Sequence, residues 1–329
     1  MKVCVLGDGG WGTALAMVLN NNGHHVSVWG PDEKNIGIIK KNNENINYLP
    51  GVKLPISIEW NSNMNEVIND VELIVIAVPS KYYRNTVIKL STILDYKVHI
   101  LSATKGIDEQ THETMSEISQ SILNQSVAVI SGPSHAEEVA RGIPSAVTIA
   151  ANKEYLAEEV QNILINDYFR IYTSSDVKGV ELGGALKNII AIAAGISDGL
   201  GYGDNTKAAL ITRGLAEIIR LGVSLGADIK TFSGLSGLGD LMVTCMSKHS
   251  RNRGVGERIG QGESLENIMN DMKMVAEGVW NCKAVKSIAD KSNIKIPIIE
   301  QTYSILYDNV SPKIAMESLM KRLPISEVE

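Results

Sequence analysis

The feature that most constrains this chain is a glycine-rich turn close to its start. Residues 7–12 read GDGGWG, which fits the pattern G-x-G-x-x-G, and they directly follow the short apolar run Val3–Leu6. A helix-like stretch, Thr13–Asn22, comes next and ends at Gly23. Such a turn between a first strand and a first helix is typical of dinucleotide-binding domains, because unpaired N–H groups at the helix start bind phosphates. The sequence therefore predicts nucleotide binding, and a glycine turn without a ligand is the alternative.

Five further apolar runs in the first half are separated by stretches of helical character. They are His25–Trp29, Leu73–Val78, Lys97–Ser102, Val127–Ile130 and Ala146–Ile149. Strands that alternate with helices build a parallel sheet that is covered by helices on both faces. We therefore predict an α/β fold in which a doubly wound, mostly parallel sheet of the Rossmann type forms the N-terminal domain.

After about residue 175 the strand-like runs almost disappear and helical segments follow one another, punctuated by Gly and Pro. They are expected at residues 176–196, 205–225, 253–260, 264–271, 279–291, 297–308 and 312–322. A chain of 329 residues is also too long for one ordinary core. We expect two domains: an NAD(P)-binding Rossmann domain at residues 1–178 and an all-α substrate-binding domain at residues 179–329.

Composition narrows the class of partner. The net charge of −6 argues against a nucleic-acid binder, which usually carries a basic surface. The widely spaced Cys4, Cys245 and Cys282 form no CxxC pair, which argues against a disulfide framework or zinc site and fits a reducing compartment. The longest apolar stretch, residues 180–196, contains Lys187 and other polar residues, so it suits a buried helix better than a membrane span. We predict a cytoplasmic protein with no nucleic-acid partner, no membrane span and no bound metal.

The residues after the second predicted strand bear on the choice of cofactor. An acid at this point binds the 2′-hydroxyl of the ribose, whereas a basic residue favours the 2′-phosphate of NADP. Here Trp29 is followed by Gly30, Pro31 and Asp32. Pro31 can do neither, Asp32 also suits a helix N-cap, and Lys34 could reach a phosphate. The expected cofactor is therefore NAD or NADP, with a slight preference for NAD.

Lys187 is the strongest candidate for a catalytic residue. It lies in the run 180–194, where almost every other residue is small or apolar, and a helix that is apolar on most sides is buried. Burial lowers the pKa of a lysine, so that it can exchange a proton near neutral pH. An alcohol that loses a hydride must also lose its hydroxyl proton, and Lys187 can accept that proton. The alternative is a structural ion pair, for example with Glu181, or a side chain that extends to solvent.

Two polar segments follow predicted strands, at the edge of the sheet where ligands bind. Lys105 comes after one of these strands and either points into an active-site crevice or is an ordinary loop lysine. Residues 131–138 follow another strand, and there Ser134 is a candidate N-cap, with Glu137 completing a capping box. His135 beside it is interpreted as structural, although the same turn could also bind an anion.

The second half holds two further polar clusters. The glycine-rich turn at residues 234–240 ends in Asp240, and Thr244 follows one helical turn later on the same helix face. Residues 250–253 read SRNR and start a short helix, where arginine and free backbone N–H groups can form an anion site. A solvated basic turn is the alternative for the SRNR segment.

Taken together, these segments resemble the bacterial NAD(P)-dependent glycerol-3-phosphate dehydrogenases. The resemblance extends to about residue 320. It rests on blocks that occur in the family's order: GDGGWGTALA at 7–16, ATKGI at 103–107, SGPSHAEEVA at 131–140, ELGGALKNIIAIAAG at 181–195, GLGDLMVTC at 237–245, SRNR at 250–253 and VAEG at 275–278. Each block alone is modestly specific, whereas their ordered occurrence is strong evidence.

The resemblance implies a role for each block. Lys187 resembles the family's catalytic proton acceptor. Substrate contacts are implied at Lys105, Gly132, Ser134, Lys187, Asn188, Asp240, Thr244, Ser250, Arg251 and Asn252. Of these, Ser250, Arg251 and Asn252 would hold the phosphate end of the substrate. Cofactor contacts are implied at Gly7, Gly9, Gly10, Trp11, Gly12, Lys105, Ala136, Arg251, Val275 and Glu277.

The reaction that the resemblance implies is reversible hydride transfer between NAD(P)H and dihydroxyacetone phosphate. The product would be sn-glycerol 3-phosphate for glycerophospholipid synthesis, and the expected assembly is a homodimer. Two alternatives are a related two-domain dehydrogenase that acts on a hydroxy acid or sugar acid, and a catalytically silent, NAD-sensing regulatory protein.

Three positions depart from the family's pattern. Gly10 stands where the family often has serine, so that one hydroxyl contact to a cofactor phosphate is missing. Pro31 stands where many members carry arginine or histidine, which puts a preference for NADP in doubt. Asn281 replaces a threonine that is often found, with no effect that the sequence indicates.

Overall fold

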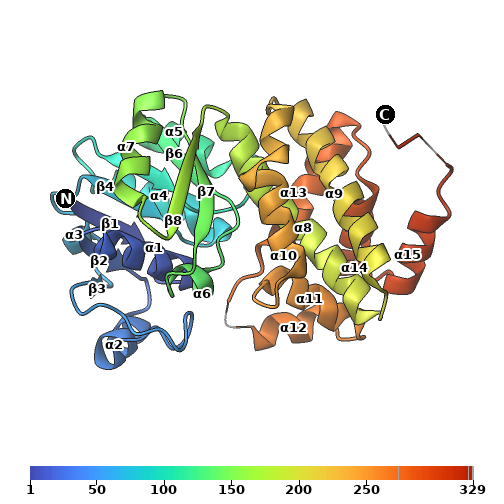
Figure 1. Cartoon of the computed structure of the whole chain (residues 1–329), viewed down its shortest axis with the longest axis horizontal. Helices are drawn as coiled ribbons and strands as arrows, with labels where there is room; N and C mark the ends of the chain where they lie inside the picture. Colours follow the sequence, from blue (N-terminus) through green and yellow to red (C-terminus); the bar gives the residue numbers. More distant parts are fainter. Residues whose placement is uncertain (273, 325, 328–329) are drawn as a thin grey trace.

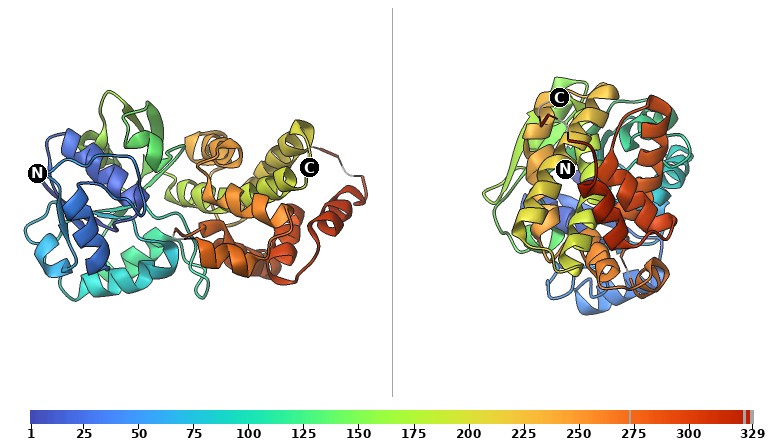
Figure 2. Two further views of the ribbon diagram at one scale, coloured as in Figure 1. Left: turned by 90° about the horizontal axis from the view of Figure 1, so that it is seen from below. Right: turned by 90° about the vertical axis from the view of Figure 1, so that its right-hand side faces the viewer.

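The computed structural model describes residues 1–272, 274–324 and 326–327. Two units lie side by side along the longest axis of the molecule (Figure 1). The first half of the chain builds a unit around a sheet, and the second half builds a helical unit. The left view in Figure 2 shows the same separation from below.

Within the described residues, one eight-stranded sheet has the order β3-β2-β1-β4-β5-β6-β7-β8. Its strands are β1 (Lys2–Leu6), β2 (His25–Trp29), β3 (Glu59–Asn61), β4 (Leu73–Ile76), β5 (His99–Ser102), β6 (Val127–Ser131), β7 (Ser145–Ala150) and β8 (Phe169–Ser174). Neighbouring strands are parallel except β6 and β7, which run antiparallel. The prediction of a mostly parallel sheet is therefore confirmed.

Both faces of the sheet are covered by helices. In the first unit these are α1 (Gly10–Asn21), α2 (Glu33–Asn42), α3 (Met64–Val67), α4 (Ser80–Ser91), α5 (Met115–Leu123), α6 (Ala136–Val139) and α7 (Glu154–Leu164). Successive residues of β1 belong to opposite faces, because side chains alternate along a strand. Val3 and Val5 pack in the core under α1, α2 and α7, whereas Cys4 and Leu6 pack in the core under α3, α4 and α5.

The glycine-rich turn lies between β1 and α1, as predicted, although α1 begins at Gly10 rather than Thr13. Gly7 has φ of 128°, and a Cβ there would lie 2.7 Å from the carbonyl oxygen of Ala77. A Cβ on Gly12 would lie 2.0 Å from the carbonyl oxygen of Gly7. Both positions therefore require glycine, since any side chain would open the turn.

The helical unit is built around α8 (Val177–Gly199). The other helices of this unit are α9 (Asp204–Ser224), α10 (Asp240–Met246), α11 (Arg251–Gly260), α12 (Leu265–Asp271), α13 (Glu277–Ser292), α14 (Pro297–Tyr307) and α15 (Pro312–Met320), with short 3₁₀ and π turns at Ile229–Ser233 and Leu235–Gly239. Helix α8 is long and apolar enough to cross a membrane, but 94% of its most apolar window is buried inside the protein. The prediction of a buried helix is confirmed.

Glycines bring α8 and α11 into close contact. A Cβ on Gly195 of α8 would lie 2.0 Å from the carbonyl oxygen of Arg253, and a Cβ on Gly256 of α11 would lie 2.0 Å from that of Ile192. The two backbones therefore touch where they cross. This contact fixes the position of the N-terminus of α11 relative to α8.

Candidate active site

Lys187 lies in the middle of α8 and is buried, with 5% of its surface exposed. Its Nζ lies 2.7 Å from Asp240 Oδ1 and donates to Thr244 Oγ1 at 2.5 Å. Burial lowers the pKa of Lys187 to about 8, against the opposing effect of Asp240. Glu181, the alternative partner, instead accepts hydrogen bonds from Ser116. Two of the three ammonium protons are thus engaged, and the third is left for a ligand.

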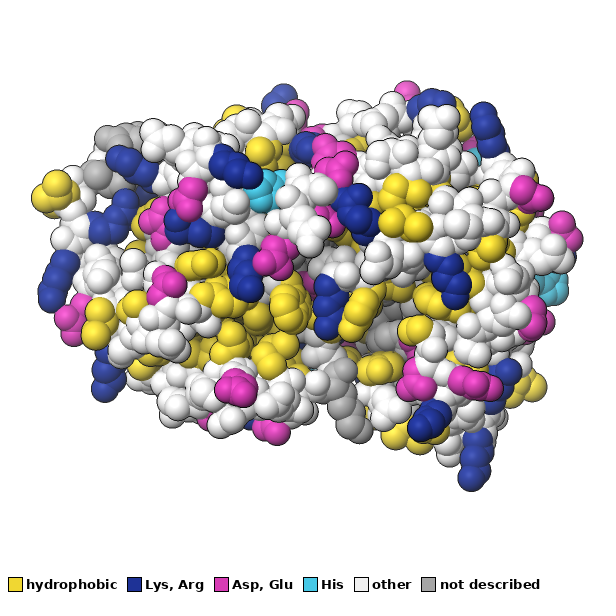
Figure 3. Space-filling model, turned by 180° about the vertical axis from the view of Figure 1, so that it is seen from behind, with side chains coloured by type: hydrophobic (Ala, Val, Ile, Leu, Met, Phe, Trp, Pro, Cys, Tyr) yellow, Lys and Arg dark blue, Asp and Glu magenta, His cyan; other side chains and the backbone are white. Residues whose placement is uncertain are grey.

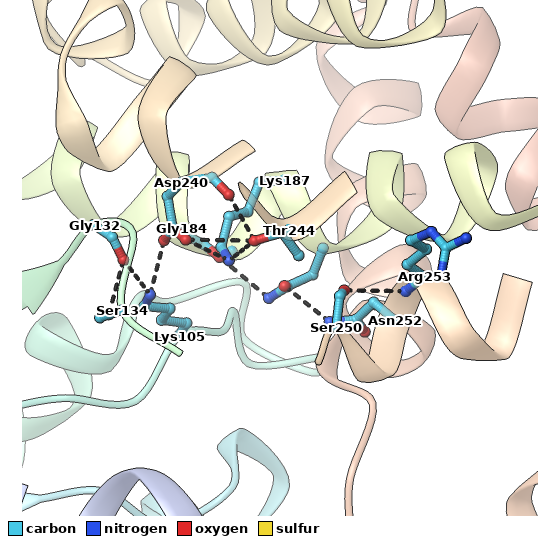
Figure 4. Close-up of polar contacts among 12 residues, drawn as sticks. Lys105, Gly132, Ser134, Gly184, Lys187, Asp240, Thr244, Ser250, Asn252 and Arg253 are labelled. Carbon is cyan, nitrogen blue, oxygen red and sulfur yellow. Dashed lines mark hydrogen bonds and ion pairs between the residues drawn. The ribbon is translucent and has the colours of Figure 1, made fainter. Parts of the chain in front are cut away.

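Asp240 joins the two lysines (Figure 4). It begins α10, and its Oδ2 lies 2.7 Å from Lys105 Nζ while its Oδ1 faces Lys187. Burial alone would raise the pKa of Asp240, but the ammonium groups of Lys105 and Lys187 hold it below its usual value. The carboxylate therefore stays charged and holds both cations at one place.

Small residues on α8 let these groups meet. A Cβ on Gly184 would lie 2.5 Å from Ser131 Oγ and 3.4 Å from Lys105 Cδ. A Cβ on Gly183 would lie 2.4 Å from the carbonyl oxygen of Ser236, in the turn before α10. Any larger side chain in this glycine pair would push away either the end of β6 and Lys105 or the turn that carries Asp240.

The turn after β6 supports Lys105. The carbonyl oxygen of Gly132 accepts a hydrogen bond from Lys105 Nζ at 3.2 Å and one from Ser134 Oγ at 2.8 Å. The predicted capping box is wrong: α6 begins at Ala136, its N-cap is His135, and no side chain caps it. The hydroxyl of Ser134 lies one residue too early and is used inside the turn.

The N-terminus of α11 lies at the other end of this group of residues. Ser250 is its N-cap and accepts a hydrogen bond from the backbone N–H of Arg253 at 3.2 Å. Asn252 Nδ2 donates to Asn188 Oδ1 at 2.9 Å, and Asn252 Oδ1 accepts from the N–H of Gly278 at 2.8 Å. One amide hydrogen of Asn252 is left for a ligand, next to the free N–H groups of a helix start.

The glycine turn offers a cradle for the phosphates of a dinucleotide. Gly9 has open space where a Cβ would stand, and Gly10 begins a 12-residue helix that has no side-chain cap and no acid in its first turn. Trp11 Nε1 is buried and has no hydrogen-bond partner among the described residues. Unpaired N–H groups at an open helix start fit a pyrophosphate.

A second group of residues closes the cleft from the helical unit. Arg251 Nη1 donates to the carbonyl oxygen of Val275 at 3.0 Å. Glu277 accepts hydrogen bonds from the backbone N–H and the hydroxyl of Ser80, at the start of α4. Burial raises the pKa of Glu277, while Ser80 and Arg251 oppose this effect. The hydrogen bonds of Glu277 connect the two units directly beside the cleft.

The structure brings most of the predicted site residues together along one cleft. Those that line it are Gly9, Gly10, Trp11, Lys105, Ser134, Ala136, Lys187, Asn188, Asp240, Thr244, Ser250, Arg251, Asn252, Val275 and Glu277. Gly7, Gly12 and Gly132 do not line it and act through the backbone of their turns.

Sequence reasoning missed several cleft residues. Tyr48 and His249 line the cleft, yet neither lies in a recognisable pattern. His135, which we interpreted as structural, also lines it, with its ring 5.9 Å from that of His249. Burial lowers the pKa of His135, and the charge of Lys187 adds to this effect. The neutral form of His135 is therefore favoured.

Comparison with known proteins shows which family the chain belongs to. The models that match describe the N-terminus and the C-terminus of NAD-dependent glycerol-3-phosphate dehydrogenase, at residues 2–157 and 176–317. A glycerol-3-phosphate dehydrogenase (NAD(P)+) of Agathobacter rectalis is 48% identical over 322 residues, which cover 98% of this chain and 96% of that protein. The chain belongs to the NAD-dependent glycerol-3-phosphate dehydrogenase family. A glycerol-3-phosphate dehydrogenase (NAD(P)+) of Fusobacterium nucleatum is 47% identical, over 98% of this chain and 97% of that protein.

The fold agrees with this family. The crystal structure of a glycerol-3-phosphate dehydrogenase from Coxiella burnetii matches with a TM-score of 0.95 and 37% identity, over 98% of this chain and 99% of that one. As a member of the glycerol-3-phosphate dehydrogenase family, the chain is an oxidoreductase acting on a CH–OH group, and its cofactor is NAD or NADP.

Proposed function

We propose that this chain catalyses the reversible interconversion of dihydroxyacetone phosphate and sn-glycerol 3-phosphate with NAD(P)H. The observation that carries the proposal is the group formed by Lys187, Asp240 and Lys105, which lies in the same cleft as the N-terminus of α11. A buried lysine suits proton transfer, and a helix start with an arginine suits a phosphate. The other wall of the cleft includes the glycine turn of a dinucleotide site.

The cofactor would be held by the turn from Gly7 to Gly12, Ala136, Val275 and Glu277. When bound, its nicotinamide supplies or accepts the hydride. Trp11 Nε1 and the open start of α1 fit its phosphates. Lys105 and Arg251 both line the cleft, and the family resemblance implies that each contacts both cofactor and substrate.

The chain's own residues would bind the substrate and move the proton. Ser250, Arg251 and Asn252 would grip the phosphate, and Ser134, Asn188 and the turn at Gly132 would flank the rest of the molecule. Lys187 would donate a proton to the ketone oxygen through its third N–H. In the reverse direction, neutral Lys187 would accept the hydroxyl proton. Asp240 and Thr244 hold Lys187 in place and Asp240 also orients Lys105.

The first test is absorbance at the reduced-nicotinamide band with dihydroxyacetone phosphate and NADH or NADPH. Lys187→Ala should lower turnover by about 10²–10⁴-fold while the cofactor still binds. Lys178→Ala, on the same helix but paired with Glu117, is the matched control and should keep its turnover. Near-normal turnover in Lys187→Ala would remove Lys187 from the catalytic role. Cofactor binding without any turnover in the folded native protein would favour a sensing protein.

The phosphate site has a separate test. Arg251→Ala should chiefly raise the KM for the phosphorylated substrate, because it removes a charged partner of the phosphate. Arg258→Ala, further along α11, breaks only exposed ion pairs with Glu263 and Asp271 and serves as the control. An unchanged KM in Arg251→Ala would exclude Arg251 from the phosphate site.

We also propose the organisation around this activity. The cofactor domain would comprise residues 1–178 and the substrate domain residues 179–329, in a cytoplasmic enzyme that supplies glycerophospholipid synthesis. A homodimer is supported by apolar side chains that gather on the face of the helical unit in Figure 3. It is also supported by an apolar groove at α14 and α15, lined by residues such as Ile305, Met316 and Leu319. Light scattering from the purified protein would measure the assembly.

A further inference from the structure

An aspartate of the glycine turn lies directly against the end of β2. A Cβ on Gly30 would stand 2.4 Å from Asp8 Cγ, so the carboxylate of Asp8 packs on the backbone that follows Trp29. Asp8 is 8% exposed, and its Oδ2 accepts a hydrogen bond from Asn35 Nδ2 at 2.6 Å. Dinucleotide folds bind the adenosine ribose at this end of the second strand. A fixed carboxylate therefore lies beside the strand end at which the ribose would bind.

A second acid, Asp32, follows the same strand end in the sequence. Asp32 is the N-cap of α2, and its Oδ1 accepts a hydrogen bond from the backbone N–H of Lys34 at 2.9 Å. Burial raises the pKa of Asp8, and the nearby negative charge of Asp32 adds to this effect. Between them, Pro31 offers neither an N–H nor a side-chain donor.

The charges around this turn oppose a phosphate. Glu33 follows Asp32 in the first turn of α2, and Lys34 is the one cation in the run from Gly30 to Asn35. A 2′-phosphate carries about two negative charges and needs cationic partners. A 2′-hydroxyl, in contrast, can donate to a carboxylate. The start of α2 is already capped by Asp32, so its N–H groups are less available to a phosphate.

We propose that this chain selects NAD(H) over NADP(H), and that Asp8 and Asp32 are the residues that select it. The inference rests on the proposed dinucleotide site. Asp8 is held by Asn35 and accepts the ribose hydroxyl, whereas Asp32 chiefly repels the 2′-phosphate. Pro31 carries no charge, so it does not compensate this repulsion.

The test is direct binding to the full-length protein, without substrate. NADH and NADPH are titrated separately and followed by nicotinamide fluorescence. NADH should bind about 10²-fold more tightly, because only its 2′-hydroxyl gains a charge-assisted hydrogen bond and only the 2′-phosphate meets two like charges. Added salt should narrow the difference, since exposed Asp32 is screened.

Substitutions test which residues cause the preference for NADH over NADPH. Asp32→Asn keeps an N-cap residue and should reduce the preference for NADH over NADPH by about three- to tenfold, mainly by tighter NADPH binding. Adding Pro31→Arg should reduce this preference further, because the guanidinium can pair with the 2′-phosphate. Asp8→Asn should reduce the preference mainly by weaker NADH binding. Asp167→Asn, an exposed site before β8 with the same change of charge, should leave the preference unchanged.

Several results would overturn the proposal. Equal or tighter binding of NADPH by the native protein, with normal turnover, would refute the selection but leave the proposed function intact. Loss of that NADPH binding in Lys34→Ala would then identify Lys34 as the phosphate partner. If the preference for NADH over NADPH is unchanged in folded Asp8→Asn and in folded Asp32→Asn, these two residues are not its cause. Binding of neither cofactor would refute the selection together with the proposed function.

Discussion

Asp240 offers the sharpest test of the proposed proton transfer. The carboxylate contacts Lys187 and Lys105 at 2.7 Å each, in a buried position. At this distance and an effective dielectric constant of about 20, each pair corresponds to about 6 kcal/mol of Coulomb attraction. Asp240→Asn removes that charge but keeps the shape of the side chain. A net loss of one quarter of the attraction between Asp240 and Lys187, about 1.5 kcal/mol, lowers the pKa of Lys187 by about one unit.

The measurement is kcat/KM for the reduction of dihydroxyacetone phosphate between pH 6 and 10. Reduction needs protonated Lys187, so the rate of the native protein should fall as the pH rises through about 8. In Asp240→Asn the pKa of Lys187 is lower, so the rate should begin to fall at a pH that is at least about one unit lower. The maximal rate should also decrease, because Lys105 and Lys187 lose the group that positions them.

The matched control is Asp198→Asn. Asp198 is also largely buried and pairs with two cations, Arg253 and Lys207, but it does not line the cleft. This variant should lose stability without a shift of the pH profile. Circular dichroism would establish that both variants are folded. An unshifted basic limb in folded Asp240→Asn would refute the conclusion that Asp240 sets the pKa of Lys187.

Two further predictions concern the scaffold. Gly256→Ala should cost about 1–3 kcal/mol of unfolding free energy and raise the KM for the phosphorylated substrate, because its Cβ would meet the Ile192 carbonyl and displace α11. Gly254 is on the same helix with open space around it, so Gly254→Ala should be neutral or slightly stabilising in a denaturant titration. Equal effects of the two substitutions would refute the conclusion that the crossing of α8 and α11 requires glycine at position 256. Glu217→Ala should cost about 2–5 kcal/mol, since it leaves the N–H groups of Ile298 and Ile299 buried and unpaired at the start of α14. A change below about 1 kcal/mol in thermal unfolding would show that water replaces the carboxylate.

The sequence was most informative where a local pattern is tied to a physical requirement. The turn at residues 7–12 was predictable because glycine at Gly7 and Gly12 is required by the backbone itself. The central strands and α8 were predictable because continuous apolar runs have to be buried. The edge strands β3 and β8 were missed. The former has only three residues, and the latter alternates buried and exposed positions without an apolar run.

Contacts between distant segments were the part that local patterns could not supply. Lys187 was identified as a buried base from its apolar helix, but its partner was not Glu181, six residues away. The partner is Asp240, which lies on another helix and joins Lys187 to Lys105. Tyr48 reaches the cleft from a loop after α2, with no signal in the sequence. The capping-box prediction at Ser134 failed because α6 begins at Ala136, so that His135 and not Ser134 is its N-cap.

The charge of the cleft explains how an acidic chain can hold an anionic substrate. The protein carries a net charge of −6, yet Lys105, Lys187 and Arg251 all line the cleft. Asp240 contacts both lysines and balances only one of their two charges, and Arg251 adds a further cation at the start of α11. The effect of the overall charge weakens with distance and salt, whereas the cations that line the cleft act on a bound phosphate at contact distance. The same carboxylate that keeps both lysines in place thus leaves enough positive charge for a phosphate, and its removal should impair proton transfer before phosphate binding.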